Sequence, residues 1–268
     1  FDPATGETLS KGGESFSESF GKTMVELGSS DQRICAITAA MPSGTGLMAF
    51  QKTFPERTFD VGIAEEHAVT FAAGLAAAGM KPYVAIYSTF LQRAYDQVFQ
   101  DIAMLHLHMV LAIDRAGLVG DDGPTHHGVF DVGFLRQIPG MTILTPATLE
   151  EQRRMLRWAV EEHNGPVAIR YPRGGEGAYR ADSGEAPAVS LRPGKDLTMV
   201  GYGVEINELL AAADGLAREG IEAEVIKLNE LTPLPTELVL ESVRRTGALL
   251  VAEDSIASAG VGQRLAAA

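Results

Sequence analysis

Charged and imidazole side chains that could perform acid–base and anion-binding chemistry occur where predicted strands lead into helices. Carboxylates transfer protons, guanidinium groups bind phosphates through forked hydrogen bonds, and imidazoles titrate near neutral pH. Loops at the carboxyl ends of parallel strands form the usual ligand site of such sheets. The candidates are Glu65, Glu66, Arg93, Arg115, His126, His127 and Arg173. Gathered at one edge, they predict an enzyme that handles phosphates.

Each of these residues also has a purely structural explanation. The helix dipole favours Glu65 or Glu66 in a first helical turn whatever its function. An arginine at a strand end is commonly solvated, two adjacent histidines in a loop are commonly exposed, and Phe90 at a strand-to-helix junction commonly belongs to the core. The gathering of nearly all of them at one edge of a sheet is what favours a functional site.

Short β-rich apolar runs alternate with longer helical runs, which predicts a parallel sheet with helices on both faces. The predicted strands include "RICAITAAM", "PYVAIYS", "MVLAIDR", "MTILTP" and "PVAIRYP". The predicted helices include "AEEHAVTFAAGLAAAG", "FLQRAYDQVFQDIAML" and "LEEQRRMLRWAVEEH". The fold class is therefore α/β, and a long loop over residues 116–128 carries both histidines.

A change in composition divides the chain. Residues 1–174 form the first predicted domain, 175–195 are rich in Gly, Pro and Ala and predict a linker, and 196–268 repeat the strand–helix alternation. This second unit is small for an α/β domain. The chain also begins at Phe1 and stops in "GVGQRLAAA", which has the pattern of an unfinished helix. We therefore expect an incomplete second domain and a longer parent polypeptide.

The composition argues against some classes of partner. A formal net charge of −13 argues against nucleic acid and anionic membranes, whose phosphates attract Lys and Arg. The sequence has no apolar run of about 18 residues, the length that predicts a membrane span. The single cysteine, Cys35, lies in an apolar run and predicts a buried thiol. One unpaired cysteine fits a reducing compartment.

Long strings in the first domain resemble the 1-deoxy-D-xylulose-5-phosphate synthases, a family of transketolase-like thiamine-diphosphate enzymes. The strings are "DVGIAEEHAVTFAAGLAAAGMKPYVAIYSTFLQRAYDQVFQDIA", "AIDRAGLVGDDGPTHHGVFD" and "AIRYPRG". They distinguish this family from transketolases proper and from 2-oxo acid dehydrogenase β subunits, which share the fold. The resemblance extends over essentially the whole chain and is densest over residues 60–174. It implies a pyrimidine-binding domain followed by a transketolase C-terminal domain.

The resemblance also implies roles in cofactor binding. Glu65 matches the carboxylate that hydrogen-bonds the aminopyrimidine ring of thiamine diphosphate, where it favours the imino tautomer that accepts the thiazolium proton. Phe90 matches the aromatic side chain that stacks on this ring, and Tyr87 and Arg93 lie beside it in the family's pocket.

Further matches concern the substrates. Arg115 and Arg173 match arginines that bind the phosphate of glyceraldehyde 3-phosphate, with Tyr87 in the same pocket. Asp122 and His126 match loop residues near the substrate, and His126 is a candidate proton carrier or orienting group. The resemblance leaves the role of His127 open.

The sequence departs from the family in two places. The family's Gly-Asp-Gly…Asn motif, which binds the metal and the diphosphate, is absent. In the family this motif lies on an amino-terminal domain, so no metal ligand is expected in this chain. Mg²⁺ is expected on the missing domain, and the chain alone is expected to be inactive. In "EDSIASAGVG", Ala259 stands where the first glycine of a pair is expected.

Three functions stay open at this point. The leading one is a transferase that decarboxylates pyruvate and joins the two-carbon unit to glyceraldehyde 3-phosphate, giving 1-deoxy-D-xylulose 5-phosphate for isoprenoid and thiamine biosynthesis. The second is a section of a split transketolase or a 2-oxo acid dehydrogenase β subunit. The third is a non-catalytic assembly module. The resemblance further implies a cytoplasmic bacterial homodimer, for which the small residues of "AAGLAAAG" could supply a face.

Overall fold

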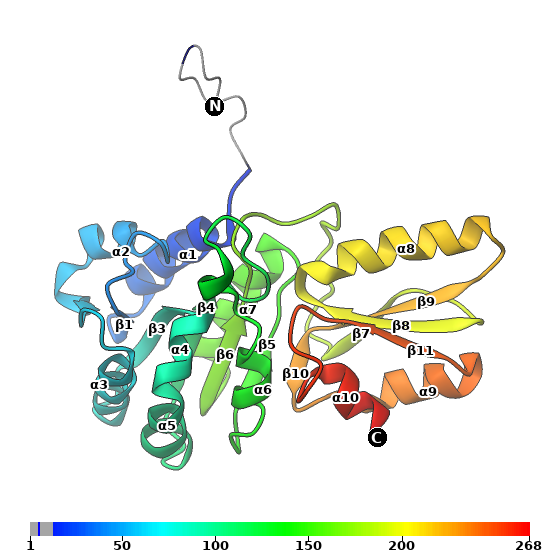
Figure 1. Cartoon of the computed structure of the whole chain (residues 1–268). Coiled ribbons are helices and arrows are strands. Elements are labelled where there is room, and N and C mark those ends of the chain that lie inside the picture. The colour runs from blue at the N-terminus through cyan, green and yellow to red at the C-terminus, as the bar shows by residue number, and fades with distance from the viewer. Residues whose placement is uncertain (1–4, 6–12) are drawn as a thin grey trace.

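The computed structural model describes residue 5 and residues 13–268 of the chain. This part of the chain forms two α/β units side by side, each with helices on both faces of its sheet (Figure 1). Over the described residues, the first sheet has seven strands in the order β10-β5-β6-β4-β3-β1-β2, and the second has four in the order β11-β8-β9-β7. The α/β fold class predicted from the sequence is confirmed.

The first sheet is parallel apart from its edge strand β10. Side chains alternate between the two faces of a strand, and here both faces are buried. In β1, Cys35 and Ile37 face one core while Ile34 and Ala36 face the other. A strand buried on both faces has a continuous apolar sequence, which is why the pattern predicted these strands. The strands are β1 (Ile34–Thr38), β2 (Thr58–Asp60), β3 (Lys81–Tyr87), β4 (Met109–Asp114), β5 (Thr142–Leu144), β6 (Pro166–Arg170) and β10 (Glu230–Thr232).

Two groups of helices cover the faces of this sheet. On one face α1, α2 and α7 contribute Phe20, Phe50 and Leu156 to one apolar core. On the other face α3 and α6 contribute Val69 and Leu135 to a second core. The helices are α1 (Phe16–Ser30), α2 (Met48–Thr53), α3 (Glu65–Ala77), α6 (Asp131–Leu135) and α7 (Leu149–Glu161). No helix within the described residues is both long enough and apolar enough to cross a bilayer.

The segment over residues 90–105, predicted as one helix, is broken in the structure. It consists of α4 (Ser88–Leu91), a 3-10 turn (Gln92–Ala94), α5 (Tyr95–Gln97) and a π-helical segment (Val98–Ala103). Such irregular turns interrupt the regular helical ladder and are common at functional sites. Here the 3-10 turn carries Arg93, whose side chain reaches Glu65.

The second unit is bound to the first more closely than a flexible linker predicts. Its sheet contains β7 (Ala188–Arg192), which lies inside the predicted 175–195 linker and pairs antiparallel with β9 (Ala223–Leu228). In addition, β10 leaves this unit and pairs with β5 of the first sheet. The remaining elements are β8 (Leu197–Tyr202), α8 (Ile206–Arg218), α9 (Thr236–Thr246), β11 (Leu249–Ala252) and α10 (Val261–Ala266).

Candidate functional site

The candidate site lies at the carboxyl ends of the strands of the first sheet. Tyr87 is the last residue of β3, and Arg115 directly follows β4. Glu65 is the first residue of α3, which follows β2, and Arg173 comes three residues after the end of β6. Because the strands are parallel, these ends share one edge of the sheet, as the sequence predicted.

Glu65 is buried, and an arginine covers its carboxylate. Its side chain is 3% exposed and its Oε1 accepts a hydrogen bond from Nη1 of Arg93 at 2.9 Å. The side chain of Arg93 is 51% exposed, so this cover lies at the surface. The neighbouring Glu66 is exposed. Of these two adjacent carboxylates, Glu65 is therefore buried under Arg93 and Glu66 lies at the surface.

An aromatic cluster lies next to this carboxylate. The rings of Tyr87 and Phe90 are stacked with centroids 5.8 Å apart, and His126 meets Phe90 edge-on at 5.4 Å. The guanidinium of Arg93 lies 5.2 Å from the centroid of Phe90. Phe90 is only partly buried, so part of its ring is exposed beside Arg93 and Tyr87. The structure thus brings four of the predicted site residues into one cluster around Phe90.

The two predicted phosphate-binding arginines share one aspartate. Asp122 accepts from Nε of Arg115 at 3.2 Å, and its other oxygen lies 3.3 Å from Nη1 of Arg173. Asp121 lies 2.9 Å from the same nitrogen of Arg173. Both arginines line a groove of about 580 Å³ together with Ser15, Ser17 and Gly44. They lie on the same side of the molecule, and acidic side chains of the 116–128 loop contact them.

Arg115 is held by several groups at once. Its backbone adopts φ 56°, a conformation that costs a non-glycine residue about 1 kcal/mol. Its Nη1 donates to the carbonyl oxygen of Gly44 at 2.8 Å and to Oδ1 of Asp114 at 2.9 Å, and its guanidinium lies 4.0 Å from the centroid of Tyr87. A Cβ on Gly44 would come 1.7 Å from the hydroxyl of Tyr87, so a larger residue there would displace the Tyr87 side chain.

Asp114 is the buried counter-ion of this arginine, and the sequence did not single it out. Burial raises the pKa of its carboxyl to about 6, although Arg115 and the hydroxyl of Ser17 act to lower it. Ser17 donates to Asp114 Oδ2 at 2.7 Å. Burial also lowers the pKa of Arg115, but Asp114 and Tyr87 outweigh it and leave that pKa raised. Asp114 lies in an apolar strand next to a candidate arginine, a local signal that could have identified it; Ser17 has no comparable signal.

The two histidines have different surroundings. His126 lies beside Phe90, and its Nδ1 is 3.1 Å from the hydroxyl of Thr125, so it faces the aromatic cluster. His127 accepts the backbone N–H of Val119 at its Nδ1, at 2.9 Å. This bond ties the two ends of the 116–128 loop together. His127 therefore has a structural contact within the loop, whereas His126 lies beside the aromatic cluster.

The described residues fit part of a thiamine-type cofactor. A buried carboxylate can accept from a ring nitrogen, and the aromatic face of Phe90 can stack on a pyrimidine. No cluster of three or more His, Cys, Asp or Glu that could hold a metal ion occurs in the described part of the chain. The arrangement thus fits the organic ring of such a cofactor.

Both halves of the chain match families of known proteins. Residues 14–175 match "Transketolase, pyrimidine binding domain" and residues 186–268 match "Transketolase, C-terminal domain". Curated relatives include the 1-deoxy-D-xylulose-5-phosphate synthase 1 of Geobacter sulfurreducens, 51% identical over 98% of this chain, and that of Desulfitobacterium hafniense Y51, 50% identical over 98%. The chain spans 42% of the length of these relatives.

A solved structure is similar over nearly the whole chain. It is described as "Split gene transketolase, inactive beta4 tetramer", with a TM-score of 0.83 and 34% sequence identity. The match covers 96% of this chain and 85% of that one. The two-unit arrangement is therefore shared with a chain of similar extent.

Proposed function

The chain belongs to the transketolase family, and we propose that it forms the pyrimidine-binding half of a thiamine-diphosphate-dependent 1-deoxy-D-xylulose-5-phosphate synthase. The single observation that carries this proposal is the shared edge, where a buried carboxylate beside an aromatic cluster adjoins a groove with two arginines. The proposed substrates are pyruvate and glyceraldehyde 3-phosphate, which the resemblance of the sequence to this family implies.

Each residue has a task in this proposal. When bound, thiamine diphosphate supplies the carbanion chemistry that no side chain provides. Glu65 would accept a hydrogen bond from the protonated nitrogen of the pyrimidine and so set the tautomer of the ring. Phe90 would stack on that ring, and Tyr87 and Arg93 would border it. Because Arg93 now covers Glu65, the arginine must give up this bond when the ring arrives.

The groove with the two arginines would bind the phosphate of the aldehyde substrate. Guanidinium forks suit a phosphate dianion, and they supply positive charge in a chain whose net charge is −13. The dianion would displace Asp122, which now neutralises Arg115 and Arg173. His126, beside Phe90, would carry or orient a proton between the two halves of the site.

The metal and the diphosphate require a further part of the protein. The chain spans 42% of its relatives, and its described residues hold no metal cluster. We therefore expect Mg²⁺ and the diphosphate to be bound outside this chain. A homodimer is also part of the proposal, because Gly74 on α3 has no neighbour within 4 Å of an added Cβ, so the small-residue face of α3 is open there. A cytoplasmic location stays a prediction.

The test is a hybrid enzyme in which this chain replaces the matching 269-residue segment of the Geobacter sulfurreducens relative. We expect the hybrid to form 1-deoxy-D-xylulose 5-phosphate from pyruvate and glyceraldehyde 3-phosphate, and the purified chain alone to form none. An inactive hybrid beside an active parent would overturn the proposal. Product from the chain alone would show that the missing segment is dispensable.

A second function is favoured by the similar solved structure. That protein is described as a split-gene transketolase, so a chain of this extent can be encoded separately. This chain would then be one section of a split enzyme and would need a separate chain to bind the diphosphate. Stable co-purification with such a chain from the native source would favour this second function. A single open reading frame that encodes both parts would exclude it.

A further inference from the structure

A buried arginine bridges the two units next to the candidate site. Arg170, at the end of β6, is 4% exposed, and its Nε donates to Asp131 of α6 at 3.0 Å. Its Nη1 donates to Asp254, which follows β11 of the second unit, at 2.9 Å. The ring of Tyr202 in β8 lies 5.3 Å from the guanidinium. Burial lowers the pKa of Arg170, but Asp131 and Asp254 outweigh it, so the arginine stays charged.

Asp254 also packs against Gly117, where the loop that carries Asp122 and His126 begins. A Cβ on Gly117 would come 2.2 Å from Oδ2 of Asp254, so the carboxylate packs directly against the backbone there. Gly117 has φ 79°, a conformation suited to glycine. Gly117 and Gly128 exchange two backbone hydrogen bonds of 2.8 Å each and close the loop between them. Asp122 and His126 lie within this closed loop.

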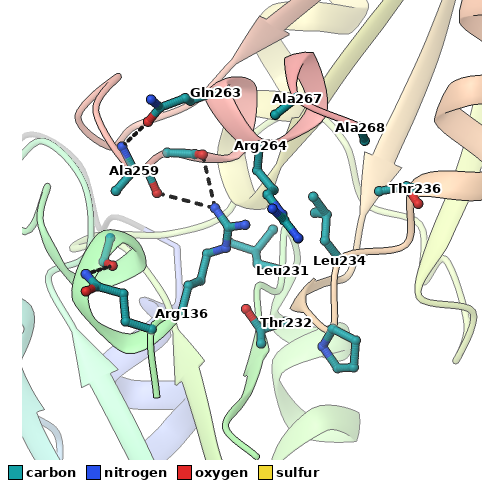
Figure 2. A pocket seen from close by; sticks show the side chains of 14 residues that line it. Arg136, Leu231, Thr232, Leu234, Thr236, Ala259, Gln263, Arg264, Ala267 and Ala268 are labelled. Atoms are coloured by element: carbon teal, nitrogen blue, oxygen red, sulfur yellow. Dashed lines mark hydrogen bonds between the residues drawn. The ribbon is translucent and has the colours of Figure 1, made fainter. Parts of the chain in front are cut away.

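Other contacts fix the rest of the segment over residues 254–260 to the first unit. The backbone N–H of Ile256 donates to the carbonyl oxygen of Val129 at 3.1 Å, one residue beyond the loop. At the far end, Arg136 donates to the carbonyl oxygens of Gly260 at 3.0 Å and Ala259 at 3.3 Å. Figure 2 shows this side chain reaching from α6 toward the segment, beside a hollow of about 800 Å³ between the units.

We infer that Arg170 and Asp254 are positioning residues through which the second unit holds the 117–128 loop in place. The physical reason is that a buried ion pair needs its partner, because a single charge left in the interior is strongly unfavourable. Arg170 therefore holds the Asp254 carboxylate at one point, and that carboxylate fills the space above Gly117. Loss of this contact frees the loop base and with it Asp122 and His126. The catalytic consequence rests on the proposed function, whereas the order of the loop does not.

A second buried pair between the units provides a matched control. Lys227 of β9 and Glu151 of α7 are both fully buried and lie 3.0 Å apart. Their hydrogen-bond partners include Ser183 and Asn229, which lie outside the 117–128 loop. Breaking this pair loosens the contact between the units without removing the carboxylate above Gly117. A general effect of loosened docking is thereby separated from a specific effect on the loop.

The experiment is hydrogen–deuterium exchange on the full chain with Asp254→Asn and Glu151→Gln variants. We expect Asp254→Asn to accelerate exchange across residues 117–128 by about tenfold or more, and Glu151→Gln to leave that loop within about twofold of the wild type. Should Asp254→Asn fail to fold, Asp254→Glu keeps the charge and only lengthens the side chain. It should accelerate exchange in the same loop. Unchanged loop exchange in the Asp254 variants, or equal acceleration in the Glu151 variant, overturns the inference.

Kinetics of the hybrid enzyme then test the positioning role. Asp254→Asn should lower kcat about tenfold and leave KM for glyceraldehyde 3-phosphate unchanged or lower, because the loop positions His126, while a freed Asp122 occupies the arginines of the groove less. Faster loop exchange with unaltered KM and kcat would overturn the positioning role. Failure of the proposed function has a different signature, since the hybrid would then make no product with any variant, while the exchange result would stand.

Discussion

Arg93 Nη1 lies 2.9 Å from Oε1 of Glu65, so a half-exposed guanidinium covers a buried carboxylate at the start of α3. This pair joins the irregular 88–103 segment to α3, and Phe90 lies under the same guanidinium. A ligand that donates a hydrogen bond to Glu65 must compete with Arg93. Arg93 therefore blocks the Glu65 carboxylate of the proposed pyrimidine site until their hydrogen bond breaks.

Arg93→Met should destabilise the chain by about 1 kcal/mol, because a buried carboxylate loses a charged donor. A ligand nitrogen can replace that donor. We therefore expect saturating thiamine diphosphate to raise the Tm of the Arg93→Met hybrid enzyme more than that of the unmutated hybrid. Differential scanning fluorimetry measures both shifts. Equal shifts would show that Arg93 does not compete with the cofactor.

Asp122→Asn should strengthen binding of inorganic phosphate in the groove, because the aspartate now occupies the guanidinium groups that would bind the anion. Removing this charge should tighten the Kd by about threefold to tenfold. Isothermal titration of phosphate into the chain measures the effect. Asp121→Asn is the matched control, since that side chain is 87% exposed and should matter less. Weaker phosphate binding by Asp122→Asn would contradict this account of the groove.

Glu230→Gln should stabilise the chain at neutral and alkaline pH but not at pH 4.5. Burial raises the pKa of Glu230 from 4.5 to about 7, and no hydrogen bond to its carboxylate is present among the described residues. A raised folded-state pKa gives a stabilising contribution that is complete below about pH 4.5 and is lost as the pH rises through about 7. At pH 8 the variant should therefore be more stable by about 1 kcal/mol, after allowance for solvent screening.

Urea unfolding at pH 4.5 and pH 8 measures this difference. The two proteins should have equal free energies of unfolding at the lower pH and differ only at the higher one. A stability difference that is the same at both pH values would mean that the ionisation of Glu230 is not responsible.

Ala259→Gly should stabilise the chain by up to about 1 kcal/mol, because Ala259 adopts φ 65°, which glycine tolerates without strain. This is the position where the sequence departs from the glycine expected by family resemblance. Ala212→Gly in the middle of α8 is the matched control and should cost about 1 kcal/mol. Chemical unfolding gives the free energy of unfolding of both variants. A destabilised Ala259→Gly protein would contradict the claim that the backbone of Ala259 is strained.

Local pattern was sufficient to predict five strands of the first sheet and the edge at which the candidate residues lie. Strands buried on both faces have continuous apolar sequences, and parallel strands collect the residues that follow them at one edge. Glu65, Arg93, Arg115 and Arg173 lie at that edge for this reason. Their roles in binding cofactor and substrate remain predictions.

Contacts between distant segments could not be predicted in this way. Arg170 meets Asp254 across 84 residues, and neither residue has a neighbour in sequence that marks the pair. The antiparallel pairing of β10 with β5 depends on packing between units, and three residues give no periodicity to recognise. The 88–103 segment has the composition of one helix, but its irregular turns carry the Arg93 side chain to Glu65, a tertiary contact invisible to helix propensity.

The account depends most on Glu65 as the acceptor for the pyrimidine ring, and exchange of the thiazolium C2 proton with deuterium tests it directly. Proton NMR of thiamine diphosphate bound to the hybrid enzyme gives the exchange rate. We expect Glu65→Gln to slow exchange by about 10² to 10⁴ and Glu66→Gln, at the exposed neighbouring position, to leave it unchanged. Equal exchange rates in the Glu65→Gln and unmutated hybrids would contradict the central claim.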